Sequence, residues 1–181
     1  MNFYNTEQIR RWDEFTMNNE PIASFDLMER AARRALDAML QIVKPSDKIF
    51  IVCGNGNNGG DGLVMAKALL DKSYQAVVVY FNSHELFSKD ALYHFHILEK
   101  AYPKQIIQTN ENFDNIDLFS FNIVIDALFG SGLNRPLDGK MLEIIKTLNS
   151  LQYCLKLAVD IPSGYPSEIN TEEINSYQDK F

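Results

Sequence analysis

The sequence predicts an α/β fold, a Rossmann-like three-layer α/β/α sandwich built on a mostly parallel sheet. Short apolar runs alternate with helical patterns along most of the chain, as in proteins whose parallel strands are joined by helices. The first run, 49–53, is continuous and ends in glycines, which is typical of a strand buried on both faces. Polar, glycine-bearing motifs follow three of the runs, as expected where ligands bind at the carboxyl edge of such a sheet.

Two helices are expected before the first strand of the sheet. Asn5 and Gln8, three residues apart, form a predicted capping pair at the start of the first helix. The residues along one side of this helix are Ile9, Trp12, Phe15 and Thr16. We interpret Trp12 as a packing residue. The second helix begins near Ser24, carries apolar residues at helical spacing, and ends before Pro45.

Strands and helices then alternate to the end of the predicted domain. After the first strand, Asn58 is expected to cap a helix that packs on the sheet. The later strands are expected at 76–81, 105–108, 122–129 and 153–161, with helices at 88–101 and 138–149. A strand order of 3-2-1-4-5 would place the topological switch point between the first and fourth strands.

Length and charge narrow the class of protein. The 181 residues suit one domain, which we expect to span 1–164, followed by a polar, acidic and poorly ordered tail at 165–181. A net charge of -7 argues against general attraction to nucleic acid, and no segment resembles a signal peptide or a membrane span. Cys53 and Cys154 fall in apolar runs, which favours buried thiols in a reducing compartment. We therefore expect a cytoplasmic protein without a nucleic-acid or membrane partner.

Three polar motifs are expected to meet in one crevice. They follow the first, fourth and fifth strands, at Gly54–Gly62, Asp126–Gly132 and Asp160–Gly164. All strands of a parallel sheet point the same way, so the segments after adjacent strands lie at one edge of the sheet. The sequence therefore predicts a ligand site at that edge.

The glycine-rich motif after the first strand is typical of a phosphate-binding loop. Its glycines let the backbone approach a ligand, and the start of the following helix offers unpaired N–H groups. For this reason we expect Gly60→Val to weaken nucleotide binding more than it lowers stability. Gly54, Gly56 and Gly59 match G-x-G-x-x-G, but no acid follows the second strand to hold a ribose, so an ordinary dehydrogenase ranks last. A purely structural turn is the alternative interpretation.

Oxygen-bearing side chains at the same edge suggest a cation site. Asp126 and Asp160 end apolar strands, where a carboxylate is costly unless something polar or charged meets it. The oxygens of Asn58, Asp126 and Ser163 could surround one hard cation. Helix capping and turn formation are the alternative roles for these residue types.

The three motifs together resemble those of the YjeF N-terminal-domain family, the NAD(P)HX epimerases. That family has N-N-G-G-D-G, D-A-L-F-G-x-G-L and D-I-P-S-G in this order, and this chain carries them at 57–62, 126–133 and 160–164. The resemblance implies a three-layer sandwich, a homodimer formed through N-terminal helices, and a potassium ion as cofactor. It also implies an isomerase that interconverts the R and S epimers of hydrated NADH and NADPH in nicotinamide nucleotide repair.

The resemblance assigns roles to individual residues. Asp160 would be the catalytic acid/base beside the reacting ring. The ligands of the potassium ion would be Asn58, Asp126 and Ser163. The substrate contacts would be Asn57, Asn58, Gly59, Gly60, Asp61, Gly130, Ser131, Gly132, Leu133, Asn134, Arg135, Pro136 and Asp160.

Two departures from the family pattern and one alternative function accompany this expectation. The family usually continues through further strands after D-I-P-S-G, so we expect a truncated product or a shortened relative. Ala32 stands where the family commonly has glycine, a mild change within a helix. The alternative function is a non-catalytic dimerising scaffold, because a eukaryotic messenger-RNA decapping enhancer carries a similar domain. Retention of Asp126, Asp160 and the asparagine-glycine loop favours the enzyme.

Overall fold

The computed structural model describes residues 4–81, 83–109, 113, 115–133, 137 and 139–165 of the chain, so most of the tail expected at 165–181 lies outside the described residues. Its centre is a five-stranded sheet in which every strand pairing is parallel. The strands are β1 Lys48–Cys53, β2 Gln75–Phe81, β3 Ile106–Thr109, β4 Ile123–Ala127 and β5 Leu155–Ala158. Their order is β3-β2-β1-β4-β5, the order that places the three polar motifs after adjacent strands.

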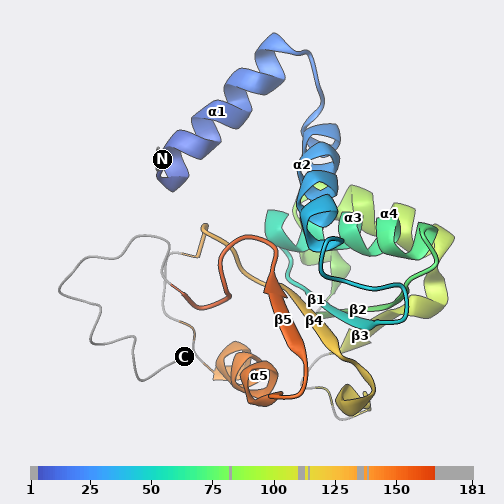
Figure 1. Ribbon diagram of the computed structural model, residues 1–181. Helices are drawn as coiled ribbons and strands as arrows, with labels where there is room; N and C mark the ends of the chain where they lie inside the picture. The colour runs from blue at the N-terminus through green and yellow to red at the C-terminus, as the bar shows by residue number, and fades with distance from the viewer. Residues whose placement is uncertain are drawn as a thin grey trace.

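Helices cover both faces of this sheet (Figure 1). They are α1 Thr6–Asn19, α2 Ser24–Met39, α3 Asn57–Asp71, α4 Lys89–Ala101 and α5 Gly139–Ser150, with short 3₁₀ turns at His84–Leu86, Pro103–Gln105 and Leu118–Ser120. The layer formed by α2, α3 and α4 packs on one face, and α5 packs on the other. The predicted three-layer α/β/α sandwich is therefore confirmed. Among the described helices, none is both long and apolar enough to cross a membrane.

The central strand β1 supplies both halves of the core. Its residues 49–53 are all fully buried, as the continuous apolar run predicts. Ile49, Ile51 and Cys53 face the layer of α2, α3 and α4, whereas Phe50 and Val52 face the layer of α5. This alternation follows from the two-residue period of a strand. Burial on both faces specifies the register of β1 between its neighbours, so the glycine motif begins directly after Cys53 at the carboxyl edge of the sheet.

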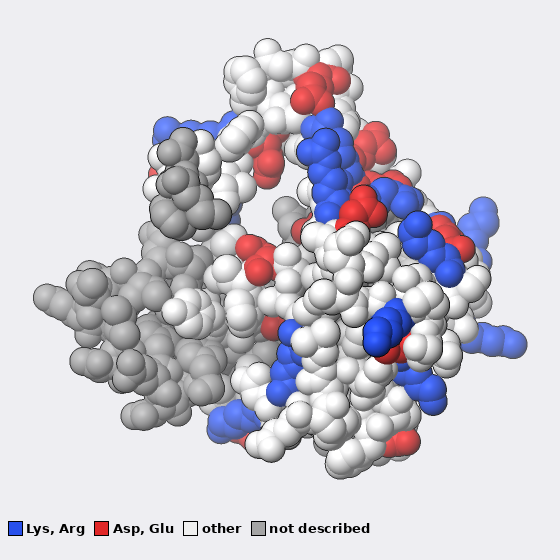
Figure 2. Space-filling model, in the orientation of Figure 1, with Lys and Arg blue, Asp and Glu red and all other residues white. Residues whose placement is uncertain are grey.

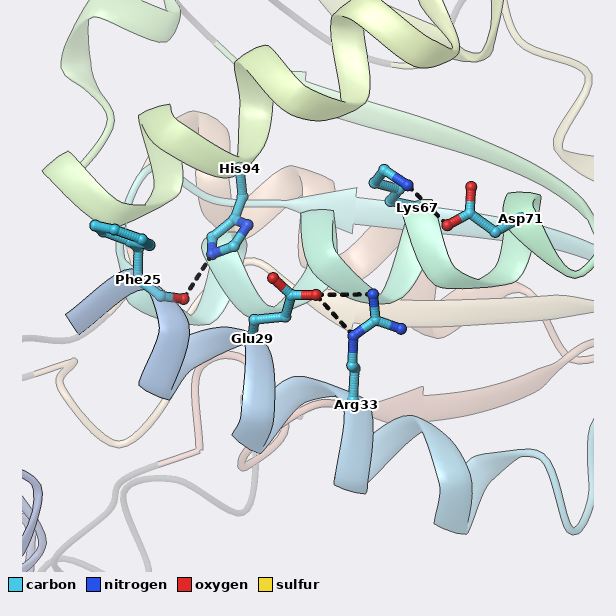
Figure 3. Close-up of polar contacts among 6 residues, drawn as sticks. All are labelled: Phe25, Glu29, Arg33, Lys67, Asp71 and His94. Atoms are coloured by element: carbon cyan, nitrogen blue, oxygen red, sulfur yellow. Dashed lines mark hydrogen bonds and ion pairs between the residues drawn. The ribbon is translucent and has the colours of Figure 1, made fainter. Parts of the chain in front are cut away.

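Among the polar contacts of the helical layer drawn in Figure 3, the one made by His94 is buried. His94 of α4 is buried, and its Nε2 donates a hydrogen bond of 2.9 Å to the carbonyl oxygen of Phe25 at the start of α2. Arg33 pairs with Glu29 along α2 on the outside of the layer. The buried bond satisfies a histidine that would otherwise be costly to bury and joins α2 to α4.

Helix α1 stands apart from the sandwich, and this corrects one prediction. Its expected capping pair is present, because the Asn5 side chain accepts from Gln8 N and the Gln8 side chain accepts from Asn5 N. No residue of α1 is buried, however, and Trp12 is 55% exposed. The interpretation of Trp12 as a packing residue is therefore wrong for the described chain. Within the described part of the chain, the one aromatic ring that its ring contacts is that of Tyr4, because α1 does not lie on the core (Figure 1).

Several element boundaries also differ from the predictions. Helix α3 begins at Asn57 with Gly56 as its N-cap, so the prediction that Asn58 caps this helix is wrong. Strand β5 spans only Leu155–Ala158, which places Asp160 two residues beyond its end and Cys154 one residue before its start. Strand β5 is shorter than predicted because its pairing with β4 covers only Leu155–Ala158.

Candidate functional site

A cavity of about 720 Å³ lies at the carboxyl edge of the sheet. The segment after β1 contributes Gly54–Asn58, the segment after β4 contributes 128–133, and Asp160 follows β5. The predicted convergence of the three motifs is therefore present in the structure. Helix α1 borders the cavity on the side away from the sheet, and acidic atoms lie along the open hollow beneath it (Figure 2).

The residues that we expected to contact substrate divide into three groups. Those that line the cavity are Asn57, Asn58, Asp61, Gly130, Ser131, Gly132, Leu133 and Asp160. Gly59 and Gly60 are buried and do not line it. Residues 134–136, which include the expected contacts Asn134, Arg135 and Pro136, lie outside the described residues.

Gly59 and Gly60 have packing roles. A Cβ atom on Gly59 would lie 1.8 Å from the carbonyl oxygen of Gly54, and one on Gly60 would lie 2.6 Å from Met28 Sδ and 3.2 Å from Ala91 Cα. Gly60 therefore allows α3 to approach α2 and α4, and the phosphate-based reason for the Gly60→Val prediction is wrong. Gly56 is different, because a Cβ there would meet nothing within 4 Å, and Gly56 lines the cavity.

Substitutions at Gly60 and Gly56 should therefore affect different properties, stability at Gly60 and nucleotide affinity at Gly56. We expect Gly60→Val to lower the free energy of unfolding by about 1–3 kcal/mol through overpacking. Gly56→Asp should leave stability intact, because Asp is a favourable N-cap, while its charge and bulk weaken nucleotide binding by about tenfold. Thermal unfolding and calorimetric titration with NADPH measure the two effects. Gly56→Asn is the neutral control, and equal affinity of wild type and Gly56→Asp would contradict the assignment of Gly56 to the ligand side.

Asp126 and Ser163 are joined by hydrogen bonds behind the cavity. Ser163 donates from Oγ to Asp126 Oδ1 at 2.6 Å and from its backbone N to Asp126 Oδ2 at 2.8 Å. The Ser163 hydroxyl also accepts from Phe129 N at 2.8 Å. These bonds hold the segment after β5 against the segment after β4. They also give the Asp126 carboxylate the polar partners that its position near the core requires.

Asn58 reaches the same place from α3. Its Nδ2 donates to the carbonyl oxygen of Phe129 at 2.9 Å. Its other amide atom, Oδ1, is buried and has no hydrogen-bond partner. Asn58 and Ser163 thus both contact Phe129, and Ser163 contacts Asp126, so the structure brings the three expected cation ligands around one residue. A buried oxygen without a donor is costly unless a donor or a cation meets it.

Three carboxylates line the cavity, and two of them have a raised pKa. Asp160 is exposed and accepts from Ser131 N at 2.6 Å through Oδ2. Burial raises the pKa of the Asp61 carboxyl to about 7, and the charges of Asp160 and Asp13 add to the rise. Burial also raises the pKa of Asp13. A carboxyl that still holds a proton near pH 7 is suited to acid/base chemistry.

The contribution of α1 to the cavity was not predicted from the sequence. Thr6, Ile9, Arg10 and Asp13 line it from above. They recur at a spacing of three or four residues, which is the signal that they share a side of the helix. That spacing could not show where the side faces, because nothing in the sequence fixes the angle between α1 and the sandwich.

Comparisons with known proteins agree with this architecture. The crystal structure of yeast ynu0 superposes with a TM-score of 0.73 at 21% identity, over 91% of this chain and 72% of that one. A protein of Limosilactobacillus fermentum is 34% identical over 165 residues, covering 91% of this chain and 74% of its own length. One of Lentilactobacillus buchneri is 37% identical over 160 residues, covering 87% and 71%. Both relatives are named NAD(P)H-hydrate epimerase.

The family comparison covers most of the chain. Residues 24–177 match the family model described as YjeF-related protein N-terminus, a range that includes all three motifs and leaves α1 outside it. The N-N-G-G-D-G, D-A-L-F-G-x-G-L and D-I-P-S-G segments therefore reflect common descent, and this chain belongs to the YjeF-related protein N-terminus family.

Proposed function

We propose that this chain is an NAD(P)H-hydrate epimerase, which interconverts the R and S epimers of hydrated NADH and NADPH. The observation that carries the proposal is the cavity at the carboxyl edge of the sheet, where the start of α3 and the carboxylates of Asp61 and Asp160 line one space. A volume of about 720 Å³ lies within the range of small-molecule and cofactor sites. The shared name of the relatives supports the same activity.

The chemistry requires a group that can exchange a proton with the ring hydroxyl. C6 of the hydrated ring bears the hydroxyl and is bonded to the ring nitrogen, so its C–H is not acidic. When a carboxyl protonates the hydroxyl, water leaves and the nitrogen lone pair stabilises the resulting cation. Water then adds to either face and gives a proton back to the carboxylate. We assign Asp160 as the catalytic acid/base, because it is exposed to the cavity and fixed by Ser131 N.

The nucleotide part of the substrate would lie against the start of α3. This helix has no side-chain cap at Gly56, so its first N–H groups remain available to a phosphate. Asn57 is held beside it, since Ser88 Oγ donates to Asn57 Oδ1 at 3.0 Å. We assign the described cavity-lining residues of the first two motifs to substrate binding, and Asn134, Arg135 and Pro136 remain predictions from the resemblance.

We further propose a potassium ion at Asn58, Asp126 and Ser163. The donor set fits, because it consists of oxygens only and includes the unpartnered Asn58 Oδ1. A bound cation would offset the charge of Asp126 and strengthen the contact between the loops after β4 and β5. The protein side chains carry the proton transfer in either case.

This cation proposal predicts a stability effect. Potassium at ten times its dissociation constant should stabilise the protein by about 1.4 kcal/mol, or about 3–6 °C in melting temperature for a chain of this size. Replacing potassium with tetramethylammonium at equal ionic strength should remove the effect. Ser163→Ala should also abolish it, whereas Ser150→Ala, which alters an exposed hydroxyl at the end of α5, should not. A melting temperature that does not respond to potassium would contradict the site.

We also propose a homodimer that uses α1. Tyr4, Ile9, Trp12 and Phe15 are all at least 45% exposed, and a second copy is the occupant that the family resemblance implies for this apolar side. The cytoplasmic location stays a prediction, supported by the free thiols of Cys53 and Cys154.

A direct assay separates the enzyme from a scaffold with the same fold. A mixture enriched in one epimer of hydrated NADH or NADPH is incubated with the purified chain and resolved by chromatography. The enzyme should return the mixture to its equilibrium ratio far faster than buffer alone does. A scaffold would leave the ratio at the buffer rate, and that result would overturn the proposed activity.

A further inference from the structure

Helix α1 lies outside the family match, which begins at residue 24, yet it forms part of the cavity wall. Thr6 Oγ1 donates to the carbonyl oxygen of Ser131 at 3.4 Å, so α1 contacts the segment after β4. Arg10, one turn further along, lies over the next residue of that segment. Its Nη2 is 3.8 Å from the point that a Cβ on Gly132 would occupy.

The acidic lining of the cavity would repel the phosphates of a nucleotide unless a basic side chain also faces them. Among the described lining residues, Asp13, Asp61 and Asp160 are acidic and Arg10 is the one basic side chain. A dinucleotide carries at least the two charges of its pyrophosphate. Its phosphates would meet a lining that is acidic on balance, and the start of α3 provides only partial positive charge. A guanidinium at the rim offers the full charge and the forked donors that phosphate oxygens accept.

Arg10 is also available for this role. Within the described part of the chain it forms no hydrogen bond or ion pair. The adjacent Arg11 is instead paired with Glu7 on α1 and does not line the cavity. The two arginines thus share a helix and are both exposed, but only Arg10 lines the ligand site. This makes Arg11 a matched control.

We propose that Arg10 is a substrate-binding residue that contacts a phosphate of the nucleotide from above the cavity. The inference rests on the proposed function and extends it to a helix outside the family match. The phosphate is either the pyrophosphate, common to NADH and NADPH, or the 2′-phosphate of NADPH alone. In the second case Arg10 also sets the preference between the two hydrates.

The test compares Arg10→Gln with Arg11→Gln in the full chain. Calorimetric titrations with NADPH and with NADH measure the dissociation constants at low and high salt, and epimerisation of both hydrates gives KM and kcat. Arg10→Gln should raise the dissociation constant and KM about tenfold, the loss expected for one charge-assisted hydrogen bond. The kcat and the melting temperature should change little, because Arg10 is exposed and takes no part in the proton transfer. Arg10→Lys should restore part of the affinity, since it keeps the charge and loses the fork.

The outcomes show which phosphate Arg10 contacts. They also separate a failure of the role of Arg10 from a failure of the proposed epimerase function. A loss with both nucleotides indicates the pyrophosphate, and a loss with NADPH alone indicates the 2′-phosphate. The loss should shrink at high salt, because an exposed charge contact is screened. Unchanged affinity of an active Arg10→Gln variant for both nucleotides would overturn the role of Arg10 alone. A wild-type chain that neither binds these nucleotides nor epimerises the hydrates would overturn the proposed function as well.

Discussion

Asp160→Asn is expected to lower the rate of epimerisation by a factor of about 10²–10⁴, the usual contribution of a general acid/base. Asparagine has nearly the same shape but cannot exchange a proton at neutral pH. The fold should survive, because an amide oxygen can still accept the hydrogen bond from Ser131 N that the carboxylate accepts now. Nucleotide binding should also survive, since that bond keeps the Gly130–Gly132 segment in place. The expected signature is a low kcat with an ordinary KM and melting temperature.

A purely structural Asp160 would behave differently. If it only holds the turn after β4, asparagine would serve almost as well and turnover would remain near that of wild type. Epimerisation and thermal unfolding should be measured together, with Asp37→Asn as a control on the exposed surface of α2. Near-normal kcat in a folded Asp160→Asn protein would remove the residue from the mechanism.

The fold could be predicted from the sequence because the central strands are continuous apolar runs that end in polar, glycine-bearing motifs. The apolar run of β1 indicated a strand buried on both faces of a parallel sheet, which the structure confirms. The edge that bears the motifs followed in turn from the common direction of parallel strands. These are rules about whole strands, and they tolerate errors of two or three residues in the ends of β4 and β5.

The site was less predictable wherever a role depended on contacts between elements. Gly60 belongs to a binding motif by sequence but packs against Met28, and only the spacing of α2 and α3 shows this. Asparagine is a residue type that often caps helices, yet the Asn58 side chain donates a hydrogen bond to the carbonyl oxygen of Phe129 at the edge of the cavity. Arg10 and Asp13 belong to none of the three sequence motifs. Their roles depend on the placement of α1, which no apolar face fixes.

The contribution of Asp61 to the stability of the wild-type protein is expected to fall as pH rises from about 4 to about 7. Its pKa is near 3.8 in the unfolded chain and about 7 in the folded one. Between these values the folded state keeps the proton while the unfolded state releases it. The free energy of unfolding contributed by this group therefore falls as pH rises, by at most about 1.4 kcal/mol per pH unit. Above pH 7 both states are ionised and the full penalty applies.

Asp61→Asn should remove this penalty, since asparagine is neutral in both states. We expect the variant to match wild type near pH 4 and to be more stable at pH 8, the reverse of what loss of a stabilising carboxylate does. Asp71→Asn provides the opposite control: hydrogen bonds from Lys67 and Tyr102 help lower the pKa of Asp71. The stability that Asp71 contributes is present above the unfolded pKa and is lost as pH falls, so its variant should be weaker at neutral pH.

The same proton links stability to activity. Asp61 lines the cavity with Asp160 and has no cation or hydrogen-bond donor beside it among the described residues. The proton that Asp61 holds below about pH 7 is available to Asp160, the residue that protonates the departing hydroxyl, so kcat of wild type should decline as pH rises through about 7. Denaturant unfolding at pH 5 and pH 8, with kcat across the same range, measures both effects. If wild type and Asp61→Asn differ in stability by the same amount at both pH values, Asp61 does not hold its proton in the folded protein.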